Sequence, residues 1–369
     1  HRQINYIPLS PDAIRAGIET QVARHRGLSA VYQDLLDFGG EELYLITPPA
    51  GIETFGEFFE RASGGIPLGL SSTKGIDLWP EWNTDVSGKS VVVLATDLPS
   101  ASRIAPKSST EAFVSGLRGT GRAPQTRPEN FLFIGWNPSA EDLRAALPHL
   151  LPVGSHLTVL LRKSQNGPNS LEFGDQIIKV IYRDDYDPLD EPSFLLSYQH
   201  VVVFADMETS AQRSDAQVLT DLIVCRHHAD EISDSESRFT IVGELRRRSS
   251  RYVAGVRLAD DLLISDSLMA AAATQLLIQP GLEPVFASLL SVDDPVEIIT
   301  KQNKPVREMN SETPWQSIQF EIAKSTGEIA IGYREEVEGV GKVVLNPPKT
   351  QPVPIKCEII VLSRASKRS

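Results

Sequence analysis

The chain has 369 residues, of which 41% are hydrophobic and 23% are charged, a composition typical of a soluble globular protein of two or three domains. Its 36 Lys and Arg residues against 48 Asp and Glu give a net charge of −12, which argues against general nucleic-acid binding. No apolar run approaches the ~20 residues of a membrane-spanning helix. Two cysteines, Cys225 and Cys357, exclude a disulfide scaffold and are expected to be reduced residues of a cytosolic protein.

Two helices are expected near the start of the chain. Ser10 is a suitable N-cap and Pro11 a suitable first residue for the earlier helix. The later one follows Gly27, because apolar residues recur at helical spacing from Leu28 to Leu36. A strand, a helix and two strands then follow, at residues 43–47, 55–59, 65–69 and 90–94.

The middle of the chain alternates between strands and helices. Residues 101–130, rich in Ser, Pro, Thr and Arg, are expected to be a linker. Apolar strands are predicted at residues 131–136, 156–161, 176–182, 200–205 and 239–244, and helices at 139–151 and 215–227. Near-continuous apolar strands separated by helices indicate a parallel sheet covered on both faces.

The last part of the chain repeats the element order of the first. Gly281–Leu290 has the pattern of Gly27–Leu36, and a helix at 268–276 precedes it. A strand, a helix and two strands again follow, at residues 296–300, 318–322, 328–332 and 358–362, about 254 to 263 residues after their counterparts. The sequence therefore predicts two homologous lobes with a different lobe inserted between them.

Five segments carry a family resemblance. Phe131–Asn137 ends a strand in Gly-Trp-Asn, and the others are 152–155, 259–266, 327–334 (Gly-Glu-Ile-Ala-Ile-Gly-Tyr-Arg) and 344–349 (Val-Leu-Asn-Pro-Pro-Lys). In this order they resemble the RCK (regulator of potassium conductance) domains of the CASTOR/POLLUX family of cation channels, over nearly the whole chain.

This resemblance implies an α/β fold with a Rossmann-like parallel sheet lobe and two homologous smaller α+β RCK C-terminal lobes. Residues 1–100 would be the C-terminal lobe of a first RCK domain and 101–129 a linker. Residues 130–255 would be the Rossmann-like lobe of a second RCK domain, and 256–369 its C-terminal lobe. The chain would then be a ligand-sensing, non-enzymatic segment of a tetrameric gating ring. A membrane pore domain would lie upstream, with the ring at the cytoplasmic face of the membrane.

The ligand crevice of such a lobe lies beyond the carboxyl ends of its strands. The first loop there, Gly135-Trp136-Asn137, lacks the second glycine of a dinucleotide-binding G-x-G-x-x-G motif. The second strand ends at Arg162-Lys163, where an NAD site needs a carboxylate, so a nucleotide cofactor is not expected. Asp206 and Glu244 end two further strands and are candidate ligand-binding residues together with the loop.

An acidic loop after the third strand is a candidate cation site. Asp184, Asp185, Asp187, Asp190 and Glu191 offer the hard oxygen atoms that Ca²⁺ and similar cations prefer. The spacing and central glycine of an EF-hand are absent, and the alternative is a solvated loop.

Two other polar clusters are weaker candidates. His227 and His228 with Glu231 are potential metal ligands, although adjacent histidines point in different directions; the alternative is a histidine at a helix end. The basic run Arg246–Arg248, with Arg251, would bind a phosphate or an acidic neighbour, or be solvated surface. No G-x-S-x-G nucleophile motif is present.

Two rival functions stay open. A dinucleotide-dependent oxidoreductase would need a phosphate-binding glycine loop and a proton-transfer residue in one cleft, and the Gly-x-Asn loop argues against it. A free-standing regulatory subunit of a potassium uptake system would share the fold but would have a start codon near His1.

Overall fold

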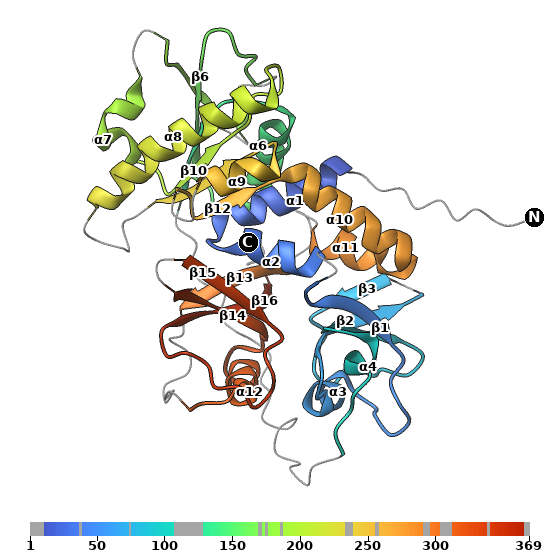
Figure 1. Cartoon of the computed structure of the whole chain (residues 1–369). Coiled ribbons are helices and arrows are strands. Elements are labelled where there is room, and N and C mark those ends of the chain that lie inside the picture. Colours follow the sequence, from blue (N-terminus) through green and yellow to red (C-terminus); the bar gives the residue numbers. More distant parts are fainter. Residues whose placement is uncertain are drawn as a thin grey trace, which may run out of the picture. The chain divides into compact units, whose positions relative to one another are not determined.

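The computed structural model describes residues 11–36, 39–73, 75–106, 128–168, 172–173, 176–184, 187–232, 239–254, 258–290, 296–302, 312–337 and 340–364. These residues form two compact units, drawn in Figure 1. One unit contains the described residues from 30 to 106 and from 271 to 364. The other contains those from 11 to 29 and from 128 to 270. Each unit has its own sheet or sheets.

The second of these units contains a six-stranded parallel sheet. Its strand order is β12 (Asp261–Leu263), β11 (Thr240–Glu244), β10 (His200–Val203), β5 (Asn130–Ile134), β6 (His156–Leu161) and β9 (Lys179–Tyr182). Numbered within the sheet this order is 6-5-4-1-2-3, that of a Rossmann fold. The predicted strand at 176–182 is divided, because β8 (Gln176–Ile177) pairs with β7 (Glu172–Phe173) in a separate hairpin.

Helices cover both faces of this sheet (Figure 1). On one face α8 (Ala211–Glu231) contacts α7 (Pro192–Leu195), α9 (Arg248–Ala254) and the 3₁₀ turn Pro188–Asp190. Val218, Leu222 and Cys225 of α8 share a buried cluster with Leu132 and Val201 of the strands. Cys225 is buried and Cys357 is half-buried, and burial raises the pKa of the Cys225 thiol.

The other face is covered by α6 (Pro138–Leu150) and by α1 (Pro11–Arg24), the first described helix of the chain. Helix α1 packs on α6 and on β10 and β11, with Ile18, Val22 and Ala23 almost fully buried. This compact unit therefore includes a helix that the sequence analysis placed with residues 1–100. The proposed division into RCK domains stays a prediction, because the two compact units do not by themselves show where one RCK domain ends and the next begins.

The other unit contains two four-stranded antiparallel sheets with one topology. The first has the order β1 (Glu42–Ile46), β4 (Ser90–Ala95), β2 (Ile66–Ser72), β3 (Gly75–Leu78). The second has the order β13 (Val296–Gln302), β16 (Cys357–Arg364), β14 (Ile329–Val337), β15 (Val340–Leu345). Helices α3 (Phe55–Arg61) and α12 (Trp315–Thr326) occupy matching places in the chain. The repeat predicted from the sequence is therefore confirmed.

The match extends to irregular features of the backbone. The pairing with the central strand shifts by one residue between Pro67 and Gly69, and again between Ala330 and Gly332. Trp79 and Asn346, which follow β3 and β15, both have positive φ, at 59° and 39°. Both lobes have a bulge and a left-handed residue at the same places. Duplication explains this match, whereas two unrelated lobes with similar amphipathic helices would not be expected to share it.

The two lobes of this unit meet through reciprocal hydrogen bonds. Trp79 Nε1 donates to Gly327 O at 2.5 Å, and Asn346 Nδ2 donates to Gly64 O at 3.3 Å. The other helical elements with residues in this unit are α2 (Leu28–Leu36), α4 (Leu98–Ala101), α10 (Ser265–Ile278), the 3₁₀ turn Pro280–Leu282 and α11 (Glu283–Leu289). Helix α11 packs on β3, and Gln275 of α10 donates to Leu35 O at 2.9 Å.

The bulge glycines give a test of the duplicated lobes. A Cβ at Gly332 would press on Val344 O and lie 3.0 Å from Leu345 Cα, and a Cβ at Gly69 would meet the backbone of β3 in the same way. We expect Gly332→Ala and Gly69→Ala each to lower the free energy of unfolding by about 1–3 kcal/mol, measured by urea denaturation. Gly39→Ala is the control, because its Cβ would have no atom within 4 Å. Equal stability of all three variants would contradict this role.

Candidate functional site

The carboxyl ends of β5, β10 and β11 meet at the crevice where Rossmann-like lobes bind ligands. Gly135 directly follows β5 with φ at +89°, and its N–H donates to Leu160 O at 2.9 Å. A Cβ at this position would lie 3.1 Å from Phe204 O, so the turn requires glycine for both conformation and space. The chain then turns directly into α6.

Asn137 is the N-cap of α6 and is 6% exposed. Its Oδ1 accepts from Ala140 N at 2.9 Å, which satisfies one amide of the first helical turn. Its Nδ2 donates in the other direction, to Ala205 O at 2.8 Å and to Glu244 Oε2 at 2.7 Å. The residue that replaces the motif glycine therefore joins three strand ends through its own side chain.

Glu244 is the polar centre of the crevice. It is 3% exposed, and its carboxylate accepts from Asn137, from Ser139 Oγ at 3.1 Å and from Ala205 N at 3.2 Å. A helix N-terminus attracts anions because its first amides lack helical partners and the helix dipole is positive there. Glu244 places a carboxyl group from within the chain beside this helix start, through its bonds to Asn137 and Ser139.

Of the five predicted crevice residues, Gly135, Asn137 and Glu244 lie at the joined strand ends. The side chains of Trp136 and Asp206 have other partners. Gly135, Asn137 and Glu244 converge, with Ser139 as a fourth member that the sequence analysis did not single out. Trp136 is half-buried with its ring 6.3 Å from that of Phe133. Asp206 Oδ1 instead accepts from Glu208 N at 2.8 Å, in the loop that follows β10.

Two of the four described carboxylates of the acidic loop, Asp184 and Asp187, have protein partners. Asp184 Oδ2 accepts from the Lys163 amide, and Asp187 Oδ2 pairs with Arg183 Nη2 at 2.6 Å. Arg183 is also 2.8 Å from Asp221, and both carboxylates raise its pKa against the opposing effect of burial. Asp190 and Glu191 are exposed, and Asp185 lies outside the described residues. The loop is thus partly a structural ion-pair network.

Both predicted histidines lie near Glu231, with His227 Nε2 3.6 Å and His228 Nδ1 3.5 Å from its carboxyl oxygens, whereas the arginines of the basic run have separate partners. His228 Nε2 lies 2.9 Å from Leu189 O, whereas the His227 side chain is 70% exposed. Arg246 Nη1 donates to Asp206 O and Thr209 O, and Arg248 Nε donates to Ser267 Oγ. Within the part of the chain that the structure describes, no three His, Cys, Asp or Glu residues form a potential metal site.

Asp215 is a buried carboxylate that the sequence analysis missed. It is 2% exposed on α8 and accepts from the amides of Arg246 and Arg247 and from Ser250 Oγ at 2.6 Å. These bonds cap the start of α9 and tie the basic run to α8. Asp215 could not be identified from the sequence, because its partners Arg246, Arg247 and Ser250 lie more than 30 residues further along the chain.

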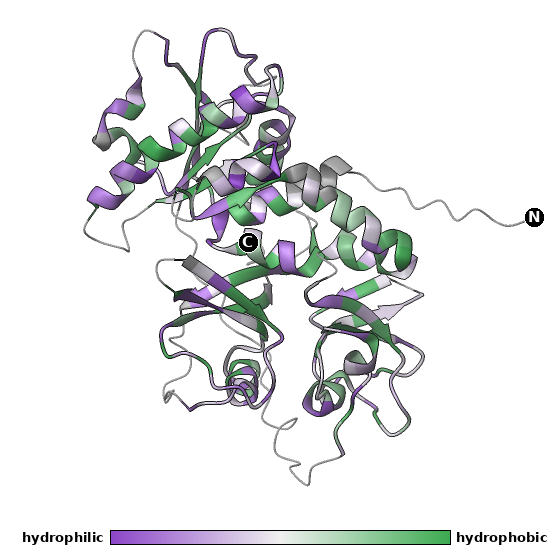
Figure 2. Cartoon of the chain, in the orientation of Figure 1, coloured by the Kyte–Doolittle hydropathy of each residue, from purple (hydrophilic) through white to green (hydrophobic). Residues whose placement is uncertain are grey.

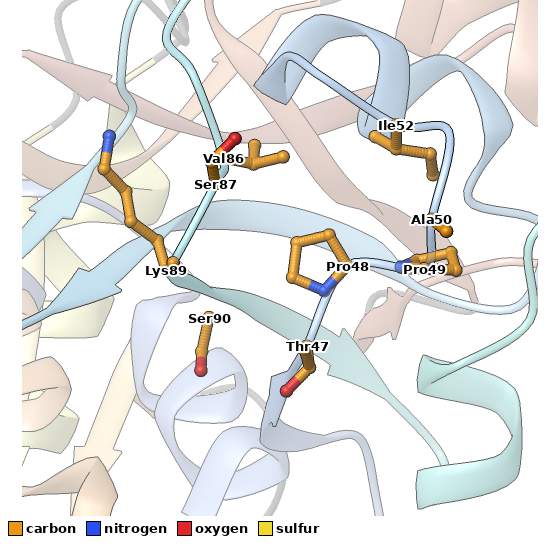
Figure 3. Close-up of a pocket in the computed structure, with 10 residues that line it drawn as sticks. Thr47, Pro48, Pro49, Ala50, Ile52, Val86, Ser87, Lys89 and Ser90 are labelled. Carbon is orange, nitrogen blue, oxygen red and sulfur yellow. The ribbon is translucent and has the colours of Figure 1, made fainter.

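A cavity of about 440 Å³ lies in the other unit, beside the loops that follow β1 and precede β4. Figure 3 shows Pro48 and Pro49 on one side of it and Ser87 and Lys89 on another. Lys89 Nζ donates to Asp85 O at 2.6 Å, and Ser87 Oγ donates to Asp85 Oδ1 at 2.7 Å. Both polar groups are used by the loop itself, so the crevice at Glu244 remains the better candidate site.

Comparison with known proteins identifies the fold. The human SLO3 gating ring matches 98% of this chain with 76% of its own, at a TM-score of 0.61 and 8% identity. The GsuK RCK domain and the GsuK channel bound to NAD match 96% of this chain with 67% and 56% of theirs, at 14% and 16% identity. Their TM-scores of 0.31 are too low to indicate a shared fold. No protein-family model and no curated protein matches the sequence.

The predicted fold class is therefore confirmed: the chain has the fold of a channel gating ring. The finer resemblance to the CASTOR/POLLUX family stays a prediction. Among the described residues, no helix is both long enough and apolar enough to span a membrane.

Glu244→Gln tests whether the internal carboxylate holds the crevice together. The variant keeps the shape but places an NH₂ group among donors, so we expect the free energy of unfolding to fall by about 1–3 kcal/mol. Chemical denaturation would measure this loss. Glu208→Gln is the control, since Glu208 is exposed and bonded to the Asn166 side chain. Equal stability of the two variants would contradict the role given to Glu244.

Proposed function

We propose that the chain is a ligand-sensing regulatory segment of a CASTOR/POLLUX-like cation channel, at the cytoplasmic face of the membrane and without catalytic activity. The observation that carries this proposal is the likeness to a gating ring over 98% of the chain, which covers both the Rossmann-like lobe and the duplicated lobes. A ligand would act on such a ring only through its different affinities for two conformations.

The repeat supports assembly into a ring. Leu277 and Ile278, at the end of α10, are 80% and 64% exposed. Their counterparts one repeat earlier are Ala23, fully buried, and Arg24, paired with Glu129 in the Rossmann-like lobe. Figure 2 shows hydrophobic residues over the same helix. We infer that this end of α10 meets a further lobe, which a neighbouring copy in a tetrameric ring would contribute.

The crevice is proposed as the regulatory site, without a dinucleotide. Glu244 already occupies the start of α6, so a phosphate there would have to displace a buried carboxylate that accepts three hydrogen bonds. A cation in the acidic loop is a second proposal, with Asp190 and Glu191 as its most accessible ligands. The cation would compete with Arg183 for Asp187.

Self-association tests the proposed ring. We expect light scattering at high concentration to detect dimers or larger species, and Leu277→Asp to weaken association at least about tenfold because it places a charge in an apolar contact. Ile355→Asp is the control, since Ile355 is 55% exposed outside α10. A strictly monomeric wild-type chain, or equal effects of both variants, would contradict the proposal.

Thermal shift tests the proposed ligands. We expect 1 mM NAD to leave the melting temperature unchanged, because the buried, hydrogen-bonded Glu244 lies beside the start of α6. Millimolar Ca²⁺ should raise it by on the order of 1–2 °C, and Asp190→Asn with Glu191→Gln should abolish the rise. A clear rise with NAD would revive the dinucleotide-binding alternative. Absence of any Ca²⁺ response at millimolar concentration would remove the acidic-loop site.

A further inference from the structure

The two duplicated lobes differ where the start of α3 or of α12 is bonded to the segment after β3 or β15. Backbone hydrogen bonds fix the correspondence between them. Gly56 N donates to Trp82 O at 2.7 Å in the first lobe, and Gln316 N donates to Lys349 O at 3.0 Å in the second. The amide before each donor also makes a matching bond in both lobes. Lys349 therefore occupies the place of Trp82.

In the first lobe aromatic rings fill this place. The Trp82 ring lies 5.7 Å from that of Phe55 and 4.9 Å from that of Phe59, and all three residues are buried. Phe55 and Phe59 are four residues apart and so share one face of α3. Their counterparts on α12 are Trp315 and Gln319. The second lobe thus keeps one aromatic ring and has an amide and an amine in place of the other two.

The amine of the second lobe has no counter-charge among the described residues. Lys349 Nζ donates to Gln319 Oε1 at 2.6 Å, and Gln319 Nε2 donates to Ala330 O of β14 at 3.1 Å. Gln319 is 1% exposed and Lys349 is half-buried. An ammonium group has three donors, and within the described part of the chain this one bond to an amide oxygen is what it makes. Burial lowers the pKa of Lys349 to about 8.

Trp315 adds a second donor without an acceptor. It is fully buried, and its Nε1 atom has no hydrogen-bond partner among the described residues. Its ring lies 6.3 Å from that of Tyr333, whose hydroxyl accepts from Gln351 Nε2 at 2.8 Å. Phe55, at the same place in the first lobe, has no N–H group to satisfy. Buried donors and charges without partners are costly, so an acceptor is needed at this place.

We propose that Lys349 and Trp315 form a binding site for the carboxylate group of a small organic acid. One carboxylate balances the single charge of one ammonium, and its two oxygens can accept from the amine and from the indole N–H. Lys349 keeps part of its surface exposed, so a small ligand can reach the amine from solvent. This site lies in a different compact unit from Glu244 and does not depend on the proposed channel function.

Titration of the full chain with acetate, followed through the indole N–H signals in NMR spectra, tests the site. Trp315→Phe, which introduces the residue of the first lobe, assigns the Trp315 signal. We expect acetate to shift this signal with a Kd on the order of 1–10 mM, and to leave those of Trp79 and Trp136 unchanged. In Lys349→Met, which keeps the length of the side chain and removes its charge, the affinity should fall at least about tenfold.

Lys89→Met is the control, because Lys89 is a half-buried lysine of the first lobe whose amine donates to Asp85 O at 2.6 Å. It should bind acetate as the wild type does, and sodium chloride at the same ionic strength should give no shift. An unchanged Trp315 signal in acetate, or an equal shift in Lys349→Met, would overturn the proposal. A response to inorganic phosphate without one to acetate would also overturn it. The wild-type titrations decide the matter even if Lys349→Met does not fold.

Discussion

The hydrogen bonds between Glu244 and the start of α6 organise the Rossmann-like lobe. One buried carboxylate joins the loop after β5, the end of β10 and the end of β11 through Asn137, Ser139 and Ala205. In a lobe that binds a phosphate, the ligand supplies negative charge to this helix start. Here the protein supplies it, so the strand ends are held in place without a ligand. The lobe has the strand order of a Rossmann fold, and one of its own carboxylates lies beside the start of α6.

Duplication sets the second constraint on the molecule. The two antiparallel sheets share their strand order, their bulges and the left-handed residues after β3 and β15. Corresponding positions therefore ought to have corresponding surroundings, and where they do not, the difference is informative. Ala23 is covered and Leu277 is exposed, which is the basis for proposing that α10 meets another lobe in an assembly.

Much of this architecture could be predicted from the sequence because it depends on local pattern. Apolar runs such as His156–Leu161 gave strand bounds that agree with β6, and the repeat could be found from helical spacing after Gly27 and Gly281. β3 and β15 were not predicted, since residues such as Gly75 and Lys342 lack the apolar alternation of a strand. The place of α1 on the parallel sheet also escaped prediction, because it depends on contacts with β10 and β11 more than 170 residues away.

The candidate site was predictable in part for the same reason. Gly135, Asn137 and Glu244 follow strand ends, and parallel strands bring their carboxyl ends to one edge. The hydrogen bonds of Glu244 to Asn137 and Ser139 at the start of α6 depend on tertiary contacts, as do the ion pair of Asp187 with Arg183 and the bonds that Asp215 accepts from the residues before α9. Each of these carboxylates looks in the sequence like an ordinary charged residue.

The most direct test of the regulatory-ring account is an electron cryo-microscopy structure of the assembled protein. The account predicts a closed ring in which a further lobe covers Leu277 and Ile278, with the Glu244 carboxylate still bonded to Asn137. A structure in which the end of α10 faces solvent and a dinucleotide occupies the crevice would contradict it.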